Sequence, residues 1–104
     1  MIRHIVLLPF KDELNDDECL ELLKGLGALI EVIPEIKSFN CGKNNSPENL
    51  DRGYLFGFVM EFLTTEDREI YLNHPDHINY ATNKILPNLV NGLNSPIVFD
   101  YEFF

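Results

Sequence analysis

The sequence predicts an α+β fold in which helices cover one face of an antiparallel four-stranded sheet. Three observations support this prediction. Strand and helix patterns follow one another in the order β-α-β-β-α-β, which is the order of the split βαβ motif. The chain has 104 residues, a length typical of one domain with one core. Apolar residues make up 45% of the chain, which is enough to fill that core.

The first strand is predicted over residues 3–10, where apolar residues occupy both alternating faces. One face carries His4, Val6, Leu8 and Phe10, and the other carries Ile5 and Leu7. A strand that is apolar on both faces is expected to be covered on both sides. Pro9 lacks a backbone donor and therefore marks the end or an edge of this strand.

A first helix is predicted to begin after Asn15, a residue that caps helices well. Glu18 lies three residues later, the spacing of a capping box, and acidic side chains in this turn suit the helix dipole. The apolar stripe of this helix consists of Cys19, Leu22, Leu23, Leu26, Leu29, Ile30 and Ile33. These positions recur at helical spacing, so the helix is amphipathic and ends before Pro34.

Residues 35–42 are predicted to form the second strand, and the polar residues 43–52 a loop. The clearest strand pattern spans residues 53–63. One of its faces carries Tyr54, Phe56, Phe58, Met60 and Phe62, and the other carries Leu55, Gly57, Val59, Glu61 and Leu63. Strict alternation of this kind is typical of a β-strand.

A second helix is predicted to run from a cap at Thr64 or Thr65 to about Asn73. His74-Pro75 then breaks it, because the residue before a proline avoids the helical conformation. A further helix begins near Asp76 and is kinked or restarted near Pro87, and the last strand covers residues 97–103. The whole chain, 1–104, is therefore predicted to be one ferredoxin-like domain.

The composition excludes several classes of partner and site. A formal net charge of −9 repels the phosphates of nucleic acids and anionic lipids. No apolar run approaches the ~20 residues needed to span a bilayer, and the N-terminal segment has no signal-peptide pattern. Cys19 and Cys41 do not form a CxxC or Cys/His cluster, so we expect free thiols rather than a zinc site. These features predict a cytoplasmic protein without nucleic-acid or membrane partners.

The predicted sheet has one face more than its helices can cover. A single chain would leave the second apolar face of the first and third strands in water. Exposed apolar patches larger than a few hundred Å² usually mark an interface. We therefore expect a homodimer in which two such sheets pack face to face.

Six short segments along the chain together resemble one known family. In order along the chain they are IRHIVLLPFKDE at 2–13, IPEI at 33–36, GKN at 42–44, RGY at 52–54, YLNHPDH at 71–77 and VFDY at 98–101. Each segment alone is a weak signal, whereas the ordered set is specific and resembles the stress-responsive A/B barrel (Dabb) family. The resemblance implies a ferredoxin-like protomer and a dimeric α+β barrel, in agreement with the face argument.

The resemblance also suggests catalytic residues. One plant member of the family closes a linear polyketide by aldol condensation, using a tyrosine and a histidine between its second and third helices. Tyr71 and His77 occupy the matching positions here, and His4 matches a pocket histidine on the first strand.

Two departures from that cyclase argue against the same substrate. Phe56 stands where the cyclase has a second pocket histidine. Leu22 and Leu26 replace aromatic residues of its apolar pocket. The resemblance therefore implies an apolar ligand pocket with Phe56, Leu22 and Leu26 in its wall, and a different ligand.

Some relatives hold a cation on backbone carbonyls where the first helix ends. The matching positions here are Ile30, Ile33 and Ile36. Free carbonyl groups at a helix C-terminus can bind a divalent cation such as Mg²⁺. No side-chain carboxylates accompany them, so we expect an opportunistic site and no required cofactor.

Two functions remain open from the sequence. In the first, each protomer holds a small apolar ligand, with His4, Tyr71 and His77 as the few polar groups of its pocket. A neutral imidazole beside a tyrosine hydroxyl then suits cyclase- or isomerase-like chemistry next to a carbonyl group. In the alternative, the protein is a non-catalytic structural or stress-protective dimer in which these groups satisfy one another. A cavity between sheet and helices favours the first function.

Overall fold

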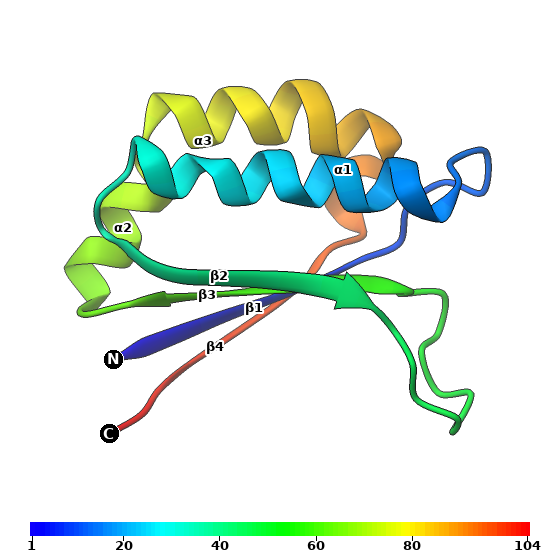
Figure 1. The fold of residues 1–104 in the computed structure, drawn as a ribbon, viewed down its shortest axis with the longest axis horizontal. Coiled ribbons are helices and arrows are strands. Elements are labelled where there is room, and N and C mark those ends of the chain that lie inside the picture. Colours follow the sequence, from blue (N-terminus) through cyan, green and yellow to red (C-terminus); the bar gives the residue numbers. More distant parts are fainter.

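The protein consists of two layers, a four-stranded sheet and a layer of helices that covers one of its faces (Figure 1). The computed structural model describes all 104 residues. The strands are β1 (Ile2–Leu8), β2 (Ile36–Lys43), β3 (Phe56–Phe62) and β4 (Ile97–Glu102). The α-helices are α1 (Asp16–Gly27), α2 (Thr65–Asn73) and α3 (Pro75–Tyr80). The strands are antiparallel in the order β2-β3-β1-β4, which confirms the predicted ferredoxin-like α+β fold.

The first helix begins as predicted, because Asn15 forms a complete capping box. Its side-chain oxygen accepts a hydrogen bond of 2.8 Å from the amide of Glu18, and Glu18 accepts one of 3.0 Å from the amide of Asn15. The regular helix ends earlier than the apolar stripe predicts. It tightens after Gly27 into a 3₁₀ turn over Ala28–Glu31.

The third strand begins later than its alternating pattern predicts. A turn occupies residues 51–54, where Arg52 has a φ of 57° and Gly53 a φ of 89°. The amide of Tyr54 donates to the carbonyl of Asp51 at 2.9 Å. This turn takes Tyr54 and Leu55 out of the sheet, so that β3 runs only from Phe56.

The core lies between the sheet and the helices. From the sheet it takes one face each of β1 and β3, on which Val6, Leu8, Phe58, Met60 and Phe62 are all buried. From the helices it takes residues such as Leu23 and Leu26.

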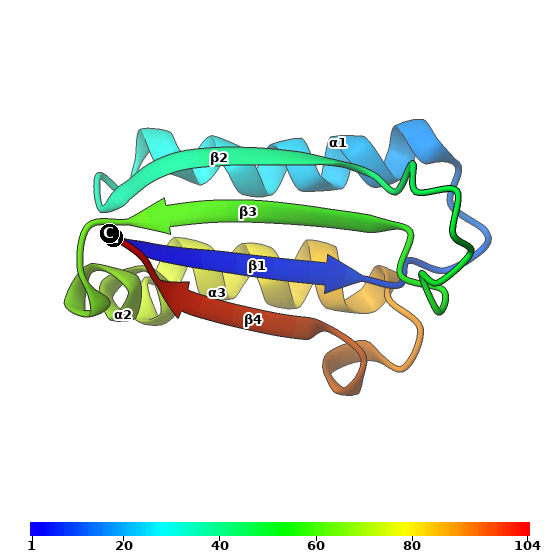
Figure 2. The ribbon, with the colours of Figure 1, turned by 90° about the horizontal axis from the view of Figure 1, so that it is seen from below.

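In the single chain the first strand is covered on one side and open on the other, as the sequence predicts for one protomer. Leu7 is 38% exposed because no helix lies on that side of the sheet, which Figure 2 shows uncovered. We call this side the open face. It consists of Arg3, Ile5, Leu7, Val59, Glu61, Ile97, Phe99 and Tyr101.

The break between α2 and α3 follows the predicted mechanism. Pro75 is the first residue of α3, and the Nδ1 atom of His74 accepts a hydrogen bond of 3.1 Å from the amide of Asp76. The helical path then widens into one π-helical stretch over Ala81–Ile85 and tightens into a 3₁₀ turn over Leu86–Asn88. The predicted irregularity near Pro87 is thus confirmed. None of the helices combines the length and apolar character that crossing a bilayer requires.

Close approach between α1 and α3 depends on Gly25. A Cβ atom at this position would overlap the Tyr80 side chain, whose hydroxyl donates a hydrogen bond of 2.6 Å to the carbonyl of Leu22. We expect Gly25→Ala to destabilise the protein by about 1–3 kcal/mol, although alanine favours helices more than glycine does. Urea unfolding followed by circular dichroism measures this. A gain in stability would show that the two helices separate at no cost.

Candidate functional site

A cavity of about 440 Å³ lies between the sheet and the helical segments α2 and α3. Its walls are mostly apolar, with Val6 and Phe58 from the sheet, Leu26 from α1 and Ile85 from the π-helical stretch. The polar side chains in its wall are His4, Arg68, Glu69, Tyr71, His77 and Asp100. A volume of this size is typical of pockets that hold small molecules.

Tyr71, on α2, is one of the most deeply buried side chains, at 1% exposure. Its ring centroid lies 4.2 Å from that of His77 and 6.0 Å from that of His4. Burial raises the pKa of Tyr71 above its usual value of 10.0, so its hydroxyl stays protonated at neutral pH. The hydroxyl is therefore a hydrogen-bond donor.

His77, in the first turn of α3, is held in one tautomer by the backbone. Its Nδ1 atom lies 3.2 Å from the carbonyl oxygen of Leu72. Because a carbonyl oxygen only accepts, Nδ1 carries the proton and Nε2 keeps its lone pair. Burial lowers the pKa of His77 below its usual value of 6.5, although the bond to Leu72 acts in the opposite direction. The side chain is therefore suited to act as a neutral base.

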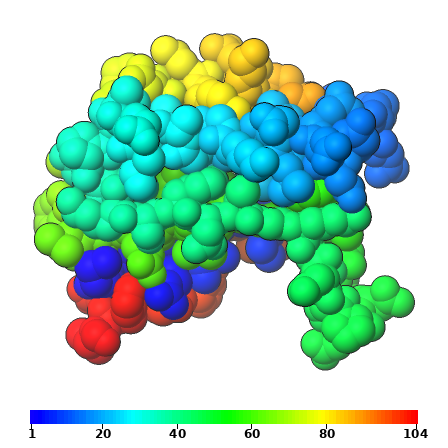
Figure 3. Space-filling model, viewed as in Figure 1, coloured from blue at the N-terminus to red at the C-terminus, as the bar shows by residue number.

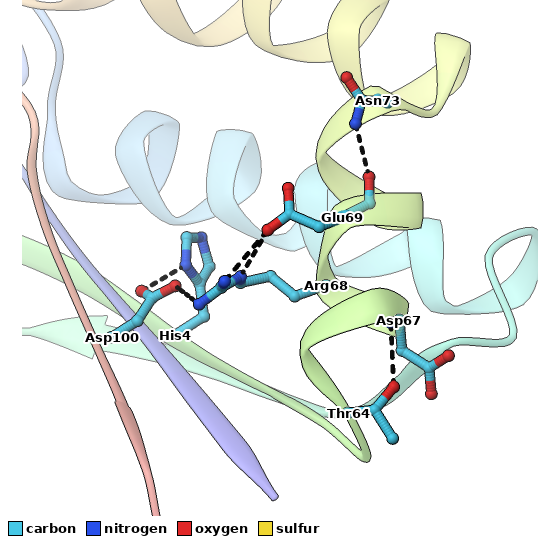
Figure 4. Close-up of polar contacts among 7 residues, drawn as sticks. All are labelled: His4, Thr64, Asp67, Arg68, Glu69, Asn73 and Asp100. Carbon is cyan, nitrogen blue, oxygen red and sulfur yellow. Dashed lines mark hydrogen bonds and ion pairs between the residues drawn. The ribbon is translucent and has the colours of Figure 1, made fainter.

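His4, on β1, is 4% exposed and pairs with a residue that the sequence did not suggest. Its Nδ1 atom lies 2.7 Å from Oδ1 of Asp100. Arg68 donates a hydrogen bond of 3.1 Å to Oδ2 of the same carboxylate (Figure 4). Alternation along β4 offered a signal for Asp100, because the last strand places an acidic residue on the helix-facing side. No comparable signal marks Arg68.

Three side chains that line this one cavity each have a polar atom without a protein partner. Every fully buried side-chain nitrogen or oxygen atom has a hydrogen-bond partner. The Tyr71 hydroxyl and the Nε2 atoms of His4 and His77 make no hydrogen bond to the protein. The side chains that carry these three atoms all line the cavity.

The structure separates the other proposed pocket residues. Leu26 lines the cavity, whereas Leu22 lies in a shallow groove beside Tyr80. Phe56 is buried at the start of β3, where its ring centroid lies 5.8 Å from that of Phe10. Neither Leu22 nor Phe56 lines the cavity. The match to the cyclase therefore does not identify wall residues of this cavity at these two positions.

The proposed cation site rests on backbone carbonyls alone. No group of three or more His, Cys, Asp or Glu side chains could hold a metal ion. The carbonyl of Ile33 already accepts a hydrogen bond of 3.1 Å from the amide of Ile36. A Mg²⁺ site on the carbonyls of Ile30, Ile33 and Ile36 remains a prediction.

The two cysteines lie away from the cavity. Cys19 is buried beneath α1, and Cys41 is half-buried on β2. Burial raises the pKa of both thiols, which makes them poor nucleophiles. We expect a Cys19→Ala, Cys41→Ala double variant to keep its fold and any ligand binding, as circular dichroism and a ligand titration would measure. Loss of binding without loss of fold would assign a role to a thiol.

Comparison with known proteins gives consistent matches. The family model described as "Stress responsive A/B Barrel Domain" matches residues 2–103. The stress-response A/B barrel domain-containing protein HS1 of Arabidopsis thaliana is 34% identical over 101 residues, which are 97% of this chain and 88% of HS1. Olivetolic acid cyclase of Cannabis sativa is 29% identical over 80 residues, 77% of this chain and 79% of the cyclase.

A solved structure agrees with these sequence matches. It belongs to a dimeric ferredoxin-like protein of unknown function from Jannaschia sp. CCS1. The TM-score is 0.84 at 25% identity, and the match covers 98% of both chains. Because the family model spans nearly every residue and HS1 matches almost throughout, the chain belongs to the stress-responsive A/B barrel domain family.

Proposed function

We propose that this protein binds a small, largely apolar carbonyl compound in the cavity and catalyses proton transfer at the carbon next to the carbonyl group. One observation carries the proposal. Three polar atoms without protein partners, on His4, Tyr71 and His77, line a single cavity whose other walls are mostly apolar. The likeness to olivetolic acid cyclase supports carbonyl chemistry.

His77 and Tyr71 have different roles in the proposed reaction. The Nε2 atom of His77 removes a proton from the carbon next to the carbonyl, and the Leu72 carbonyl stabilises the charged imidazole through Nδ1–H. The Tyr71 hydroxyl donates to the carbonyl oxygen, on which negative charge develops. The apolar walls exclude water and so strengthen both interactions.

The enolate formed in this way has two outcomes. Return of the proton from His77 to the opposite face of the same carbon, or to the γ-carbon of a ligand whose enolate is conjugated with a C=C bond, gives an isomer. Attack of the enolate on a second carbonyl group of the same ligand forms a carbon–carbon bond and closes a ring, and the alkoxide that results takes the proton back from His77, which is aldol chemistry. The proposal covers the first step, which both outcomes share.

We also propose that two protomers pack through their open faces to form a dimeric α+β barrel. Leu7, Ile97 and Phe99 expose apolar surface there, at 38%, 45% and 61%. Figure 3 shows the loop between β2 and β3 and the chain ends near β4 projecting below the sheet, with a hollow between them that a second sheet would occupy. The dimeric ferredoxin-like protein from Jannaschia sp. CCS1 supports this assembly.

Hydrogen–deuterium exchange tests the proposed chemistry without knowledge of the natural substrate. The probe is acetophenone in D₂O at pD 7.5, and proton NMR measures loss of the methyl signal. We expect wild-type protein to accelerate exchange over buffer, and Tyr71→Phe to lose most of that acceleration because it lacks the donor to the oxyanion. Tyr80→Phe is the matched control, since the Tyr80 hydroxyl bonds to Leu22 and lies outside the cavity.

One result of the same experiment would rule out the proposed chemistry. Buffer-level exchange by folded wild-type protein, for acetophenone and for the larger ketones 2-acetonaphthone and 1-tetralone, would contradict it. The non-catalytic structural dimer would then be the function that the fold supports.

A further inference from the structure

We infer that His4 is a second ligand-contacting group of this cavity, fixed as a hydrogen-bond acceptor by two positioning residues, Asp100 and Arg68. The ligand consequently carries an O–H group in addition to its carbonyl. The inference rests on the proposed function for the presence of a ligand. The tautomer of His4 itself does not depend on a ligand.

The sheet places His4 and Asp100 directly opposite one another. They are partners in the register of β1 and β4, and both side chains lie on the helix-facing side of the sheet. Their hydrogen bond of 2.7 Å joins residues 96 positions apart in the sequence. His4 is buried, and the Asp100 side chain is 19% exposed, so the pair is only weakly accessible to bulk water.

Arg68 fixes the carboxylate from the helix layer. Figure 4 shows its guanidinium between Asp100 and Glu69. One terminal nitrogen donates to Oδ2 of Asp100 at 3.1 Å, and the other donates to Glu69 at 3.0 Å. Both oxygens of Asp100 are therefore engaged, one by His4 and one by Arg68, and the carboxylate cannot turn without losing a charge-assisted bond.

This arrangement determines the tautomer of His4. A carboxylate only accepts hydrogen bonds. Nδ1 of His4 must therefore carry a hydrogen atom and donate it in the hydrogen bond to Oδ1. The other nitrogen, Nε2, then has a free lone pair when the ring is neutral. Phe58, Phe62 and Tyr71 surround the ring at centroid distances of 6.0, 6.3 and 6.0 Å, which restricts its rotation.

The free lone pair points to a ligand donor. Nε2 of His4 has no protein partner, and an acceptor in an apolar wall gains most from a ligand that brings an O–H group. If the ligand O–H gives up its proton, the imidazolium that forms is stabilised by Asp100. The aspartate of a Ser-His-Asp triad plays this role for its histidine. His4 and His77 thus contact separate functions of one ligand, with Tyr71 near both rings.

The first arm of the test needs no ligand. Protein labelled with ¹⁵N-histidine is examined by long-range ¹H–¹⁵N correlation, in which the Nδ1–H and Nε2–H tautomers give different nitrogen shifts. We expect wild-type His4 to be the Nδ1–H form. In Asp100→Asn the ratio of tautomers should move at least about tenfold towards Nε2–H, because an amide NH₂ can donate to Nδ1. Arg68→Met, which keeps an unbranched apolar side chain, should shift it in the same direction by less.

The second arm measures ligand preference with a matched pair of probes, 3-hydroxyacetophenone and its methyl ether. We expect wild-type protein to bind the hydroxyl compound about tenfold more tightly, the gain typical of one additional hydrogen bond. Asp100→Asn should lose this preference. Asp67→Asn is the matched control, because Asp67 lies on the same helix as Arg68 and its side chain does not line the cavity.

The two arms separate failure of this inference from failure of the proposed function. His4 as the Nε2–H tautomer in wild-type protein, or an unchanged hydroxyl preference in Asp100→Asn, would overturn the inference. The expected tautomers with no binding of either ketone would overturn both the proposed function and the ligand class, and leave Asp100 and Arg68 as positioning residues only.

Discussion

Replacing His77 by alanine is expected to slow exchange of the ketone's α-protons by about 10²–10⁴-fold, the usual contribution of a positioned base. The variant removes the only Nε2 atom that the backbone fixes as an acceptor, through the bond between Nδ1 and Leu72. The Tyr71 hydroxyl remains and still polarises the carbonyl, so a residual rate above buffer is expected. Single-turnover exchange of acetophenone followed by proton NMR measures the difference.

The loss should come from chemistry rather than from unfolding. His77 is half-buried, and its ring makes one hydrogen bond, to a backbone carbonyl. His74→Asn is the matched control, because His74 caps α3 and asparagine is an equally good cap. A His77→Ala variant that keeps the wild-type rate, with its fold and Tyr71 intact, would show that His77 is not the base.

The pH profile gives a second check on His77. A base must be neutral to accept a proton, and burial lowers the pKa of His77 below 6.5. The rate should therefore be level at neutral pH and fall only as the pH drops through this lowered pKa. The profile of His77→Ala should lack that acidic limb. A limb that persists in the variant would assign it to another group.

Local sequence signals predicted the elements of this fold well. Asn15 and Glu18 meet within one turn, so the start of α1 depends on neighbours in the sequence alone. The alternation along β3 follows from the pleat of a single strand, and the residues that the sequence groups on one face, from Phe56 to Phe62, are buried together. His74-Pro75 breaks the helix through the local geometry of proline. Each of these features is set within a few residues.

The candidate site depended on contacts that one sequence does not contain. The bond between His4 and Asp100 requires the register of two strands at opposite ends of the chain. Arg68 reaches that pair only because α2 lies above the sheet edge. The cavity exists because the side chains around it leave space, and no single residue type in a sequence indicates such a space. Resemblance supplied Tyr71 and His77, which the fold brings together at 4.2 Å.

The resemblance was less informative for the apolar wall. Leu22 and Leu23 are adjacent on α1, and a helix turns by about 100° per residue. Leu23 is fully buried beneath the helix, whereas Leu22 is directed towards the groove beside Tyr80. A match of positions in a helix therefore does not establish that the side chain faces the same cavity.

Replacing Phe99 by aspartate is expected to weaken the proposed dimer by at least about 10²–10³-fold in dissociation constant. Phe99 is 61% exposed on the open face, so the substitution costs the single chain little. In a two-fold dimer the change occurs twice, and each copy would bury an unpaired carboxylate between the sheets. Sedimentation velocity over a range of concentrations measures the dissociation constant.

Ile70→Asp is the matched control for this substitution. Ile70 is exposed to a similar degree, 47%, and lies on α2 in the helix layer, away from the open face. It introduces the same charge and also removes exposed apolar surface, without touching the proposed interface. We therefore expect Ile70→Asp to remain dimeric at concentrations where Phe99→Asp is monomeric.

The charges of the open face allow such a dimer in spite of the net charge of −9. Arg3 and Glu61 lie on adjacent strands of this face and form an ion pair of 2.6 Å, and Arg3 also donates to the Tyr101 hydroxyl at 2.8 Å. The face is thus apolar with internally paired charges, and its attraction is hydrophobic. Wild-type protein should consequently stay dimeric in 1 M NaCl, which screens charges beyond about 3 Å. Wild-type protein that is monomeric at micromolar concentration, or a dimer that Phe99→Asp leaves intact, would show that the open face is not the interface.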